Sequence, residues 1–359
     1  MRSDSKIYLA GHSGLVGSAI LRRLQAGGYV NIVTRRSKEL DLTRQAAVEA
    51  FFEKEQPEYV FLAAAKVGGI LANSTCKADF IYKNIMMASN VIQAAYRYKT
   101  KKLLNLGSSC IYPKFAPQPM KEEHLLTGIL EPTNEPYAIA KIAAIKLCRY
   151  YNEQYGTNFI SAMPTNLYGP KDNFDLRDSH VLPAMIRKFH EAKERQDKDK
   201  AKVEGKAKGE AQRANSSKEA VLDSSTSTST CQSSGVILWG TGAPFREFLY
   251  VDDLADACVF LMEHYDAKDV GEFVNIGSGT DMTIRELAEM IKRIVGFEGM
   301  IRWDTTKPDG TPKKLLDISR IRALGWQPKI SLEDGIRKTY AWYLETVKSE
   351  VKAVKGQGL

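Results

Sequence analysis

A tyrosine and a lysine four residues apart, preceded along the chain by a serine, form the clearest set of reactive side chains. Tyr137 and Lys141 lie in a stretch with helical periodicity, and Ser108 follows an apolar segment typical of a strand. The spacing places phenol and ammonium on one helix face, where the positive charge is expected to lower the pKa of the tyrosine. A nearby serine hydroxyl can orient a carbonyl. The set predicts proton transfer to or from a carbonyl compound.

A glycine-rich turn near the N-terminus predicts a dinucleotide site. The glycines are spaced G-x-x-G-x-x-G between a strand-like segment and the start of a helix. They allow a tight turn and let backbone N–H groups approach a pyrophosphate at the helix N-terminus. A simple loop is the alternative for the spacing alone, but its place between strand and helix favours the cofactor. The expected contacts are Gly11, His12, Ser13, Gly14, Leu15, Val16 and Gly17.

Two arginines at the end of the second predicted strand favour NADP over NAD. An acidic residue there would bind the ribose 2′-hydroxyl of NAD. The chain instead has Arg35 and Arg36, followed by Ser37, and guanidinium groups suit a 2′-phosphate. We expect Arg36 to make this contact. The alternative is an arginine that simply faces solvent in a loop, which we expect of Arg35 more than of Arg36. Asp41, followed by Leu42, can reach the adenine or, equally well, form a turn.

A parallel sheet would bring these groups together. Short β-rich runs alternate with amphipathic helical stretches, which predicts βαβ units and a doubly wound α/β fold of the Rossmann type. We assign residues 1–170, with segments near 240–276, to an NADP-binding domain. The predicted strands are 6–10, 31–34, 59–64, 102–106 and 159–163, and the predicted helices are 18–26, 78–98 and 137–155.

The rest of the chain, mainly residues 171–359, predicts a smaller α/β substrate lobe. It is expected to close over the carboxyl edge of the sheet, where open α/β sheets bind ligands. Thr283 and Glu286 have the spacing of a helix capping box. The other expected elements are a segment at 236–239, a helix at 252–263, a strand at 272–276 and a helix from about Ser331.

Residues 193–235 differ in composition from the rest of the chain. The segment has no aromatic residue, mixes lysine with acidic residues, and ends near the Ser/Thr tract at 224–230. It buries too little apolar surface to offset its ordering entropy, so we predict a disordered insertion without a catalytic role. The alternative for its Lys-rich part is an exposed extension of the helix at 181–194 by a turn or two.

Composition narrows the class of protein. A net charge of +8 is compatible with nucleic-acid binding, but no such motif accompanies it, and a basic balance also suits a substrate and cofactor rich in phosphate. Five scattered cysteines without a C-x-x-C pair predict free thiols and no metal site. The chain shows neither a long apolar run nor a secretory signal, so we expect a cytoplasmic protein with no membrane partner.

The glycine turn, the strand-end serine and the Tyr-x-x-x-Lys pair resemble the extended short-chain dehydrogenase/reductase superfamily. Longer segments resemble the GDP-L-fucose synthase family within it, from about residue 6 to 344 without the insertion. This implies 3,5-epimerisation and then NADPH-dependent 4-keto reduction of a GDP-sugar. It also implies a homodimer through the helices at 78–98 and 137–155, whose apolar faces could equally cover the sheet. The segments are 63–70, 107–113, 131–138, 164–170 and 307–312.

The same resemblance assigns roles to individual residues. Ser108, Tyr137 and Lys141 become the reductase triad, and Cys110 and His180 the pair that exchanges protons at C3 and C5. The 4-keto group acidifies those protons, and thiol and imidazole have pKa values near enough to neutrality to exchange them. Further cofactor contacts are implied at Ala64, Leu106, Gly107, Ser108, Ser109, Lys141, Pro164, Thr165, Asn166, Leu167 and His180.

Four residues are implied to hold the GDP portion: Lys188, Trp239, Arg246 and Asp309. A cation and a guanidinium fit a pyrophosphate, a ring can pack on the nucleotide, and a carboxylate can bind polar groups. Structural roles are the alternatives. Trp239 could lie in the core, Arg246 could pair with Glu247 or Asp252, and Asp309 could form a turn with Gly310.

Two other functions use some of the same motifs. A nucleotide-sugar 4-epimerase or 4,6-dehydratase shares the glycine turn and the Tyr-x-x-x-Lys pair. Dehydratases, however, carry an acidic pair after the strand-end hydroxyl, where this chain has Ser109 and Cys110. A catalytically silent NADPH-sensing or scaffold protein would keep the turn and lose the reactive residues, all of which are present here.

Overall fold

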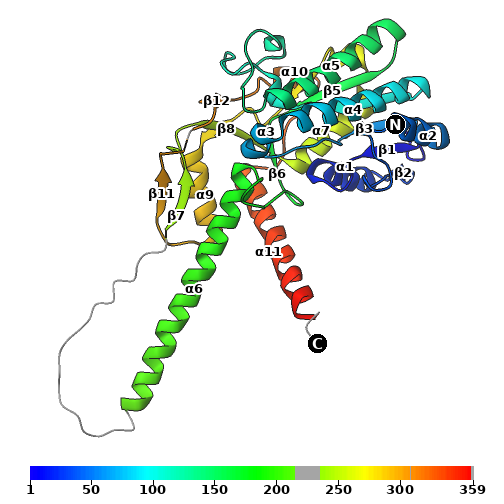
Figure 1. Cartoon of the computed structure of the whole chain (residues 1–359). Helices are drawn as coiled ribbons and strands as arrows, with labels where there is room; N and C mark the ends of the chain where they lie inside the picture. Colours follow the sequence, from blue (N-terminus) through cyan, green and yellow to red (C-terminus); the bar gives the residue numbers. More distant parts are fainter. Residues whose placement is uncertain (215–234, 308, 357–359) are drawn as a thin grey trace.

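A six-stranded parallel sheet forms the centre of the computed structural model, which describes residues 1–214, 235–307 and 309–356 (Figure 1). The strand order is β2-β1-β3-β4-β5-β9, and every neighbouring pair is parallel. From β1 the chain first moves to one side and then returns to the other, so the switch point lies between β1 and β3. The strands are β1 (Ile7–Ala10), β2 (Ile32–Val33), β3 (Tyr59–Leu62), β4 (Lys102–Leu106), β5 (Phe159–Pro164) and β9 (Val274–Ile276).

Helices cover both faces of this sheet, which confirms the doubly wound α/β prediction (Figure 1). On one face α1 (Leu15–Ala26) packs against α7 (Val251–His264). On the other, α4 (Lys77–Arg97) lies between α2 (Gln45–Glu55) and α5 (Glu135–Tyr155). The sequence predicted the elements corresponding to α1, α4, α5 and α7, but not α2.

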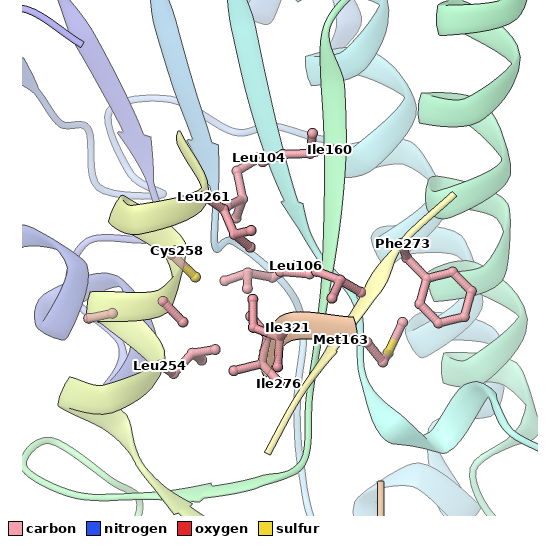
Figure 2. Packing of buried hydrophobic residues seen from close by; sticks show 14 of the residues in the cluster. Leu104, Leu106, Ile160, Met163, Leu254, Cys258, Leu261, Phe273, Ile276 and Ile321 are labelled. Carbon is pink, nitrogen blue, oxygen red and sulfur yellow. The ribbon is translucent and has the colours of Figure 1, made fainter. Parts of the chain in front are cut away.

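Figure 2 shows the core between α7 and the sheet. Leu254, Cys258 and Leu261 project from α7 into the same cluster as Leu106 of β4 and Ile276 of β9, and all five are buried. Burial of each such aliphatic side chain contributes about 1.5–3 kcal/mol. The packing therefore ties a late helix to strands from the first half of the chain and fixes the carboxyl end of β4.

A smaller lobe is built around β8 (Phe245–Tyr250). This strand pairs with β10 (Asp281–Thr283), β12 (Lys313–Lys314) and β6 (Asn166–Tyr168), while β7 (Val236–Trp239) pairs with β11 (Ile301–Asp304). The other elements are α3 (Ile70–Thr75), α6 (Val181–Ala214), α8 (Ala267–Val270), α9 (Ile284–Val295), α10 (Ser319–Ala323), α11 (Leu332–Gly356) and 3-10 turns at Ser109–Ile111 and Glu122–His124.

The capping box at the start of α9 is confirmed. The Thr283 hydroxyl accepts a hydrogen bond from Glu286 N at 3.1 Å, and the Glu286 carboxylate accepts one from Thr283 N at 2.8 Å. Across the ranges that the structure describes, no helix is both long and apolar enough to cross a membrane. Within the same ranges the cysteines are free thiols: Cys76, Cys110, Cys148 and Cys258.

The structure differs from the expected disorder in the first half of the insertion. Helix α6 continues past residue 193 and ends at Ala214, projecting from the body of the molecule (Figure 1). Its added turns are rich in Lys, Glu, Gln and Ala, which favour helix even where little surface is buried. Lys193 donates to the Val295 carbonyl at 3.0 Å, and Lys200 pairs with Glu298 at 2.7 Å. The prediction for residues 215–234 lies outside the described ranges.

A buried carboxylate on β8 ties the lobe to the central sheet. Glu247 has no exposed surface, and it accepts hydrogen bonds from Gly279 N at 2.7 Å, Leu316 N at 3.0 Å and Ser278 Oγ at 3.4 Å. We expect Glu247→Ala to lower the free energy of unfolding by about 2–5 kcal/mol, because it leaves these donors unpaired. Urea denaturation measures the loss. Glu247→Gln, which keeps an acceptor oxygen and the packing, should lose less; equal losses would contradict this explanation.

Candidate active site

The end of β4 places a hydroxyl beside a thiol. A Cβ on Gly107 would lie 2.3 Å from Met163 Cε, so a side chain there would displace the methionine, and the chain turns immediately after Gly107. Ser108 caps the following 3-10 turn, and its hydroxyl accepts a hydrogen bond from Cys110 N at 3.5 Å. The Cys110 side chain is buried. The strand end therefore holds Ser108 and Cys110 together.

Helix α5 brings Tyr137 and Lys141 to the same place. The Lys141 ammonium is buried and donates to the Leu106 carbonyl at 2.7 Å, and it lies 5.7 Å from the centroid of the Tyr137 ring. Phe80 packs edge-on against that ring, with 6.3 Å between centroids. The Tyr137 phenol reaches the Ser108 hydroxyl. The structure thus brings the predicted serine, tyrosine and lysine into one cluster.

Burial dominates the ionisation of this cluster. It raises the pKa of the Tyr137 phenol well above its ordinary value, and the hydrogen bond with Ser108 opposes the rise only in part. Burial also lowers the pKa of Lys141 to about 8. The expected lowering of the tyrosine pKa by Lys141 is not found, because the ammonium donates to a backbone carbonyl instead of the phenol. Tyr137 is therefore protonated at neutral pH and can act as a proton donor.

The predicted epimerisation pair comes from two loops, Cys110 from the turn after β4 and His180 from the loop between β6 and α6. Burial raises the pKa of the Cys110 thiol, while the Ser108 hydroxyl and the ammonium groups of Lys314 and Lys141 lower it. His180, just before α6, keeps exposed surface, but the protein atoms around its ring lower the pKa of the imidazole. Its loop is fixed to the one after β3, because Gly69 N donates to the Asp178 carbonyl at 2.9 Å.

The glycine turn lies at the switch point between β1 and β3. Gly11 has φ +83°, and a Cβ there would lie 2.8 Å from the Ala63 carbonyl carbon. A Cβ on Gly17 would lie 2.0 Å from the Gly11 carbonyl oxygen. Gly14 is the N-cap of α1 and supplies no side-chain hydrogen bond, and His12 Nδ1 is buried without a hydrogen-bond partner among the described residues. These groups fit a pyrophosphate, which needs close backbone approach and N–H donors.

The two arginines after β2 have different surroundings. Arg35 pairs with Glu55 at 2.8 Å and lies 5.5 Å over the Phe51 ring. Arg36 forms no ion pair with any residue that the structure describes, so its guanidinium is available for a 2′-phosphate. The Asp41 carboxylate accepts hydrogen bonds from Thr43 N at 3.0 Å and Thr43 Oγ1 at 2.7 Å. Asp41 therefore forms the turn that was predicted as the alternative to a contact with the adenine.

Other implied cofactor residues line the same edge or support it. Asn166 Nδ2 donates to the Glu247 carbonyl at 2.8 Å, and Thr165 N donates to the Ile276 carbonyl at 3.0 Å, so both are fixed at the end of β5. Leu42 belongs to the core. Exposed side chains belong to Ser13 and Ser37, buried ones to Leu106 and Ser109, and partly buried ones to Leu15, Val16, Ala64 and Leu167.

Lys171 is a residue of this region that sequence reasoning missed. It lies beyond β6 with φ +68°, and its charge, like that of Arg36, lowers the pKa of His12 after the larger effect of burial. A lysine in an ordinary turn sequence carries no signal of its own. Only the approach of the loop after β6 to the glycine turn indicates that its charge faces this edge of the sheet.

The four implied substrate residues gather around β7 and β8. Lys188 donates to the Ile237 carbonyl at 3.1 Å. Trp239 is 65% exposed, which excludes the core alternative. Asp309 accepts a hydrogen bond from Thr241 N at 2.9 Å, so it closes a turn beside the tryptophan.

Arg246 adopts neither of the predicted pairings with an acidic residue. Its guanidinium donates to the carbonyls of Phe245 at 2.7 Å and Thr311 at 2.5 Å. A Cβ on Gly310 would lie 2.8 Å from Arg246 Nη2, so the segment that follows Asp309 touches the guanidinium. Arg246 is thus fixed within the smaller lobe, between β8 and the segment at 310–311.

Comparison with known proteins agrees with this arrangement. A model of the NAD dependent epimerase/dehydratase family matches residues 7–277, a span that contains the glycine turn, Ser108, Tyr137 and His180. That is more than half of the chain. The chain belongs to the NAD dependent epimerase/dehydratase family. The predicted resemblance to extended short-chain dehydrogenase/reductases is thereby confirmed.

Relatives within the family match over nearly the full length. GDP-L-fucose synthase 1 of Arabidopsis thaliana is 57% identical over 344 residues, covering 96% of this chain and 94% of the relative. GDP-L-fucose synthase of Escherichia coli is 49% identical, covering 96% and 98%. A solved GDP-mannoheptose C4 reductase from Campylobacter jejuni, with NADP bound, is 42% identical with a TM-score of 0.81, covering 96% of this chain and 99% of that one.

The difference between the two arginines yields a prediction about cofactor choice. We expect Arg36→Ala to weaken NADPH binding by about 10- to 100-fold, because a charge-assisted contact is worth about 1.5–3 kcal/mol. NADH, which lacks the 2′-phosphate, should bind almost unchanged. Fluorescence titration of the reduced cofactors measures both. Arg35→Ala is the matched control, since Arg35 already pairs with Glu55; an equal loss of NADPH affinity there would contradict the assignment.

Proposed function

We propose that the protein is a GDP-L-fucose synthase, which epimerises GDP-4-keto-6-deoxy-D-mannose at C3 and C5 and then reduces C4 with NADPH. The observation that carries the proposal is the cluster of Ser108, Cys110, Tyr137 and Lys141 at the end of β4. A reductase needs a proton donor, and an epimerase also needs groups that exchange carbon-bound protons. The identity to the Arabidopsis and Escherichia coli enzymes supports the substrate.

The epimerisation uses the acidity that the 4-keto group gives to its neighbouring carbons. Cys110 and His180 act as the base and acid that exchange the protons at C3 and C5. Loss of each proton leaves an enolate, whose oxygen is held by the Ser108 and Tyr137 hydroxyls. Return of a proton to the opposite face of the carbon inverts it. A thiol and an imidazole suit this exchange because each can gain or lose a proton near neutral pH.

The reduction uses the same hydroxyl pair. When bound, NADPH supplies the hydride for C4. Tyr137 donates its proton to the carbonyl oxygen, and Ser108 orients that oxygen. Lys141, 5.7 Å from the centroid of the Tyr137 ring, would hold the nicotinamide ribose of the cofactor. The glycine turn would hold the cofactor's pyrophosphate, and Arg36 its 2′-phosphate. Lys188, Trp239, Arg246 and Asp309 would hold the GDP portion in the smaller lobe.

We further propose a cytoplasmic homodimer. Tyr82 of α4 and Ile139 and Tyr150 of α5 are large apolar or aromatic side chains that are 60%, 39% and 52% exposed. Helices α4 and α5 pack against each other, and exposed apolar side chains on adjacent helices are typical of an interface. Analytical ultracentrifugation tests the dimer, and charged substitutions at these positions should shift it toward monomer.

A second candidate is reduction of a GDP-4-keto-heptose without epimerisation, which the 42% identical Campylobacter jejuni reductase supports. The test compares NADPH oxidation with GDP-4-keto-6-deoxy-D-mannose and with a GDP-4-keto-heptose, and identifies the products by chromatography against GDP-L-fucose. We expect GDP-L-fucose as the product and a kcat/KM for the 6-deoxy sugar at least tenfold higher than for the heptose, which corresponds to about 1.4 kcal/mol of discrimination. A preference for the heptose would favour the second candidate.

A further inference from the structure

A small cavity of about 10 Å³ lies beside Cys110, and positively charged side chains crowd around it. Its lining includes Lys114, Lys313 and Lys314, with Glu131 as the acidic member. None of these lysines has a place in the family-based assignment of roles above. The Cys110 thiol therefore shares this cavity with three lysines, Lys114 from the loop after the Cys110 turn and Lys313 and Lys314 from β12. We call these three lysines the cationic wall.

Two of the three lysines are neutralised by partners. Lys114 pairs with Glu131 at 3.0 Å, and Lys313 pairs with Asp281 at 3.1 Å. Lys314 has no ion-pair partner among the residues that the structure describes. Of the three lysines in the cationic wall, Lys314 is therefore the one whose charge no carboxylate in the described ranges neutralises. This charge can act on the Cys110 thiol and on a substrate bound beside it.

The backbone holds Lys314 in place from several sides. Strand β12 pairs with β8, so Lys314 lies opposite Arg246. Beyond it, Leu315 N donates to Gln118 Oε1 at 2.9 Å, and the Leu315 carbonyl accepts from Met120 N at 2.7 Å. Both partners belong to the segment that follows the Cys110 turn. The position of Lys314 relative to the thiol is therefore fixed by the fold.

Charged and polar groups surround both the Cys110 thiol and the Lys314 ammonium. The Ser108 hydroxyl and the ammonium groups of Lys314 and Lys141 favour the ionised thiol, and burial opposes it; the Tyr137 phenol also faces it. Lys141 already donates to the Leu106 carbonyl. Around Lys314, burial and Arg246 lower the pKa of the ammonium, while Cys110 and Glu131 raise it. An ammonium without an ion-pair partner beside a thiol stabilises the thiolate.

We propose that Lys314 is a positioning residue that stabilises the Cys110 thiolate and thereby makes Cys110 the base of the epimerisation. The unprotonated sulfur removes the proton next to the ketone and becomes a thiol. The released electron pair moves into the enolate, and protonated His180 returns a proton to the other face and becomes neutral. Proton exchange with water restores the thiolate and the protonated imidazole before the second carbon is inverted. This inference rests on the proposed function. It adds a positioning lysine to the residues that the resemblance assigns to the epimerisation.

Titration of the thiol tests the inference without substrate. The ultraviolet absorbance of the thiolate is followed against pH, and the curve of the Cys110→Ser variant is subtracted so that only Cys110 contributes. We expect Lys314→Met to raise the pKa of Cys110 by about one unit or more, that is, at least about tenfold less thiolate below that pKa. Lys314→Arg should keep the pKa near its original value, because the charge remains.

Lys313→Met is the matched control, because it removes the adjacent ammonium, which is already paired with Asp281. It should leave the titration unchanged. If Lys314→Met does not fold, Lys314→Gln replaces it, with circular dichroism to verify the fold. An unchanged pKa of Cys110 in a folded, uncharged variant would overturn the inference, as would an equal shift in Lys313→Met.

A second readout separates this inference from the proposed function. The pH profile of solvent-deuterium uptake should move to higher pH in Lys314→Met and recover in Lys314→Arg. If the unaltered protein takes up no deuterium although the thiol titration depends on Lys314, the proposed function fails and the electrostatic pair stands. If deuterium is taken up with the same pH profile in all variants, the role of Lys314 fails alone.

Discussion

Tyr137→Phe is expected to lower the rate of ketone reduction by about 10²–10⁴-fold, the range typical of a lost general acid. The phenol is firmly protonated at neutral pH, since burial raises its pKa and the Ser108 hydroxyl compensates only in part. Removing one oxygen leaves the ring packed on Phe80 and leaves Lys141 on the Leu106 carbonyl. NADPH binding should therefore change little.

Single-turnover oxidation of bound NADPH measures this loss, and fluorescence titration measures cofactor affinity in the same variant. Tyr150→Phe is the matched control, because Tyr150 lies on the same helix and the residue is 52% exposed. It should leave the rate unchanged. A Tyr137→Phe protein that binds NADPH and reduces the ketone within about tenfold of the original rate would show that another group supplies the proton.

Cys110→Ser is expected to separate the two reactions of the proposed enzyme. A serine hydroxyl is a far weaker acid than a thiol, so exchange of carbon-bound protons should fall by about 10²–10⁴-fold. The reducing cluster of Ser108, Tyr137 and Lys141 is left in place. Hydride transfer to a ketone that needs no epimerisation should therefore continue, and the product should retain the original configuration at C3 and C5.

Nuclear magnetic resonance of the product and deuterium content by mass spectrometry measure this separation. Cys76→Ser is the control, since Cys76 is an exposed thiol at the start of α4. It should epimerise normally. If Cys110→Ser exchanged protons at the original rate, the thiol would be a structural residue, and the cationic wall beside it would need another explanation.

The sequence was sufficient for the architecture of the sheet and for the central cluster. Strand and helix periodicities located β1, β3, β4, β5 and the helices α1, α4 and α5 to within a few residues. A strand-end serine and an i,i+4 pair must meet when one strand and one helix adjoin, which is why Ser108, Tyr137 and Lys141 could be placed together.

Other features depend on contacts between distant segments and could not be predicted. Helix α2 is short, and its buried residues are few, so its pattern is weak. The pKa of Tyr137 depends on the burial of its phenol and on the hydrogen bond that Lys141 donates to the Leu106 carbonyl instead of to the phenol. Lys314 comes near Cys110 only because β12 pairs with β8, a pairing between short segments far apart in the chain.

The long α6 helix shows how composition can mislead. A segment with few apolar residues was expected to be disordered, because it cannot bury a face. It also has high helix propensity, and it begins from a packed helix that supplies the nucleus, so that extension needs no further nucleation. Residues 193–214 therefore continue the helix, and residues 197–204 do so with exposed side chains.

The most direct test of the central claim is a reaction in deuterated water. The purified protein is incubated with NADPH and GDP-4-keto-6-deoxy-D-mannose, and the product is analysed by mass spectrometry. Oxidation of NADPH with two solvent deuteriums on sugar carbons is the result that an epimerase-reductase predicts. Oxidation without deuterium would leave a simple ketoreductase and remove the roles of Cys110 and His180, and no oxidation at all would contradict the proposed substrate.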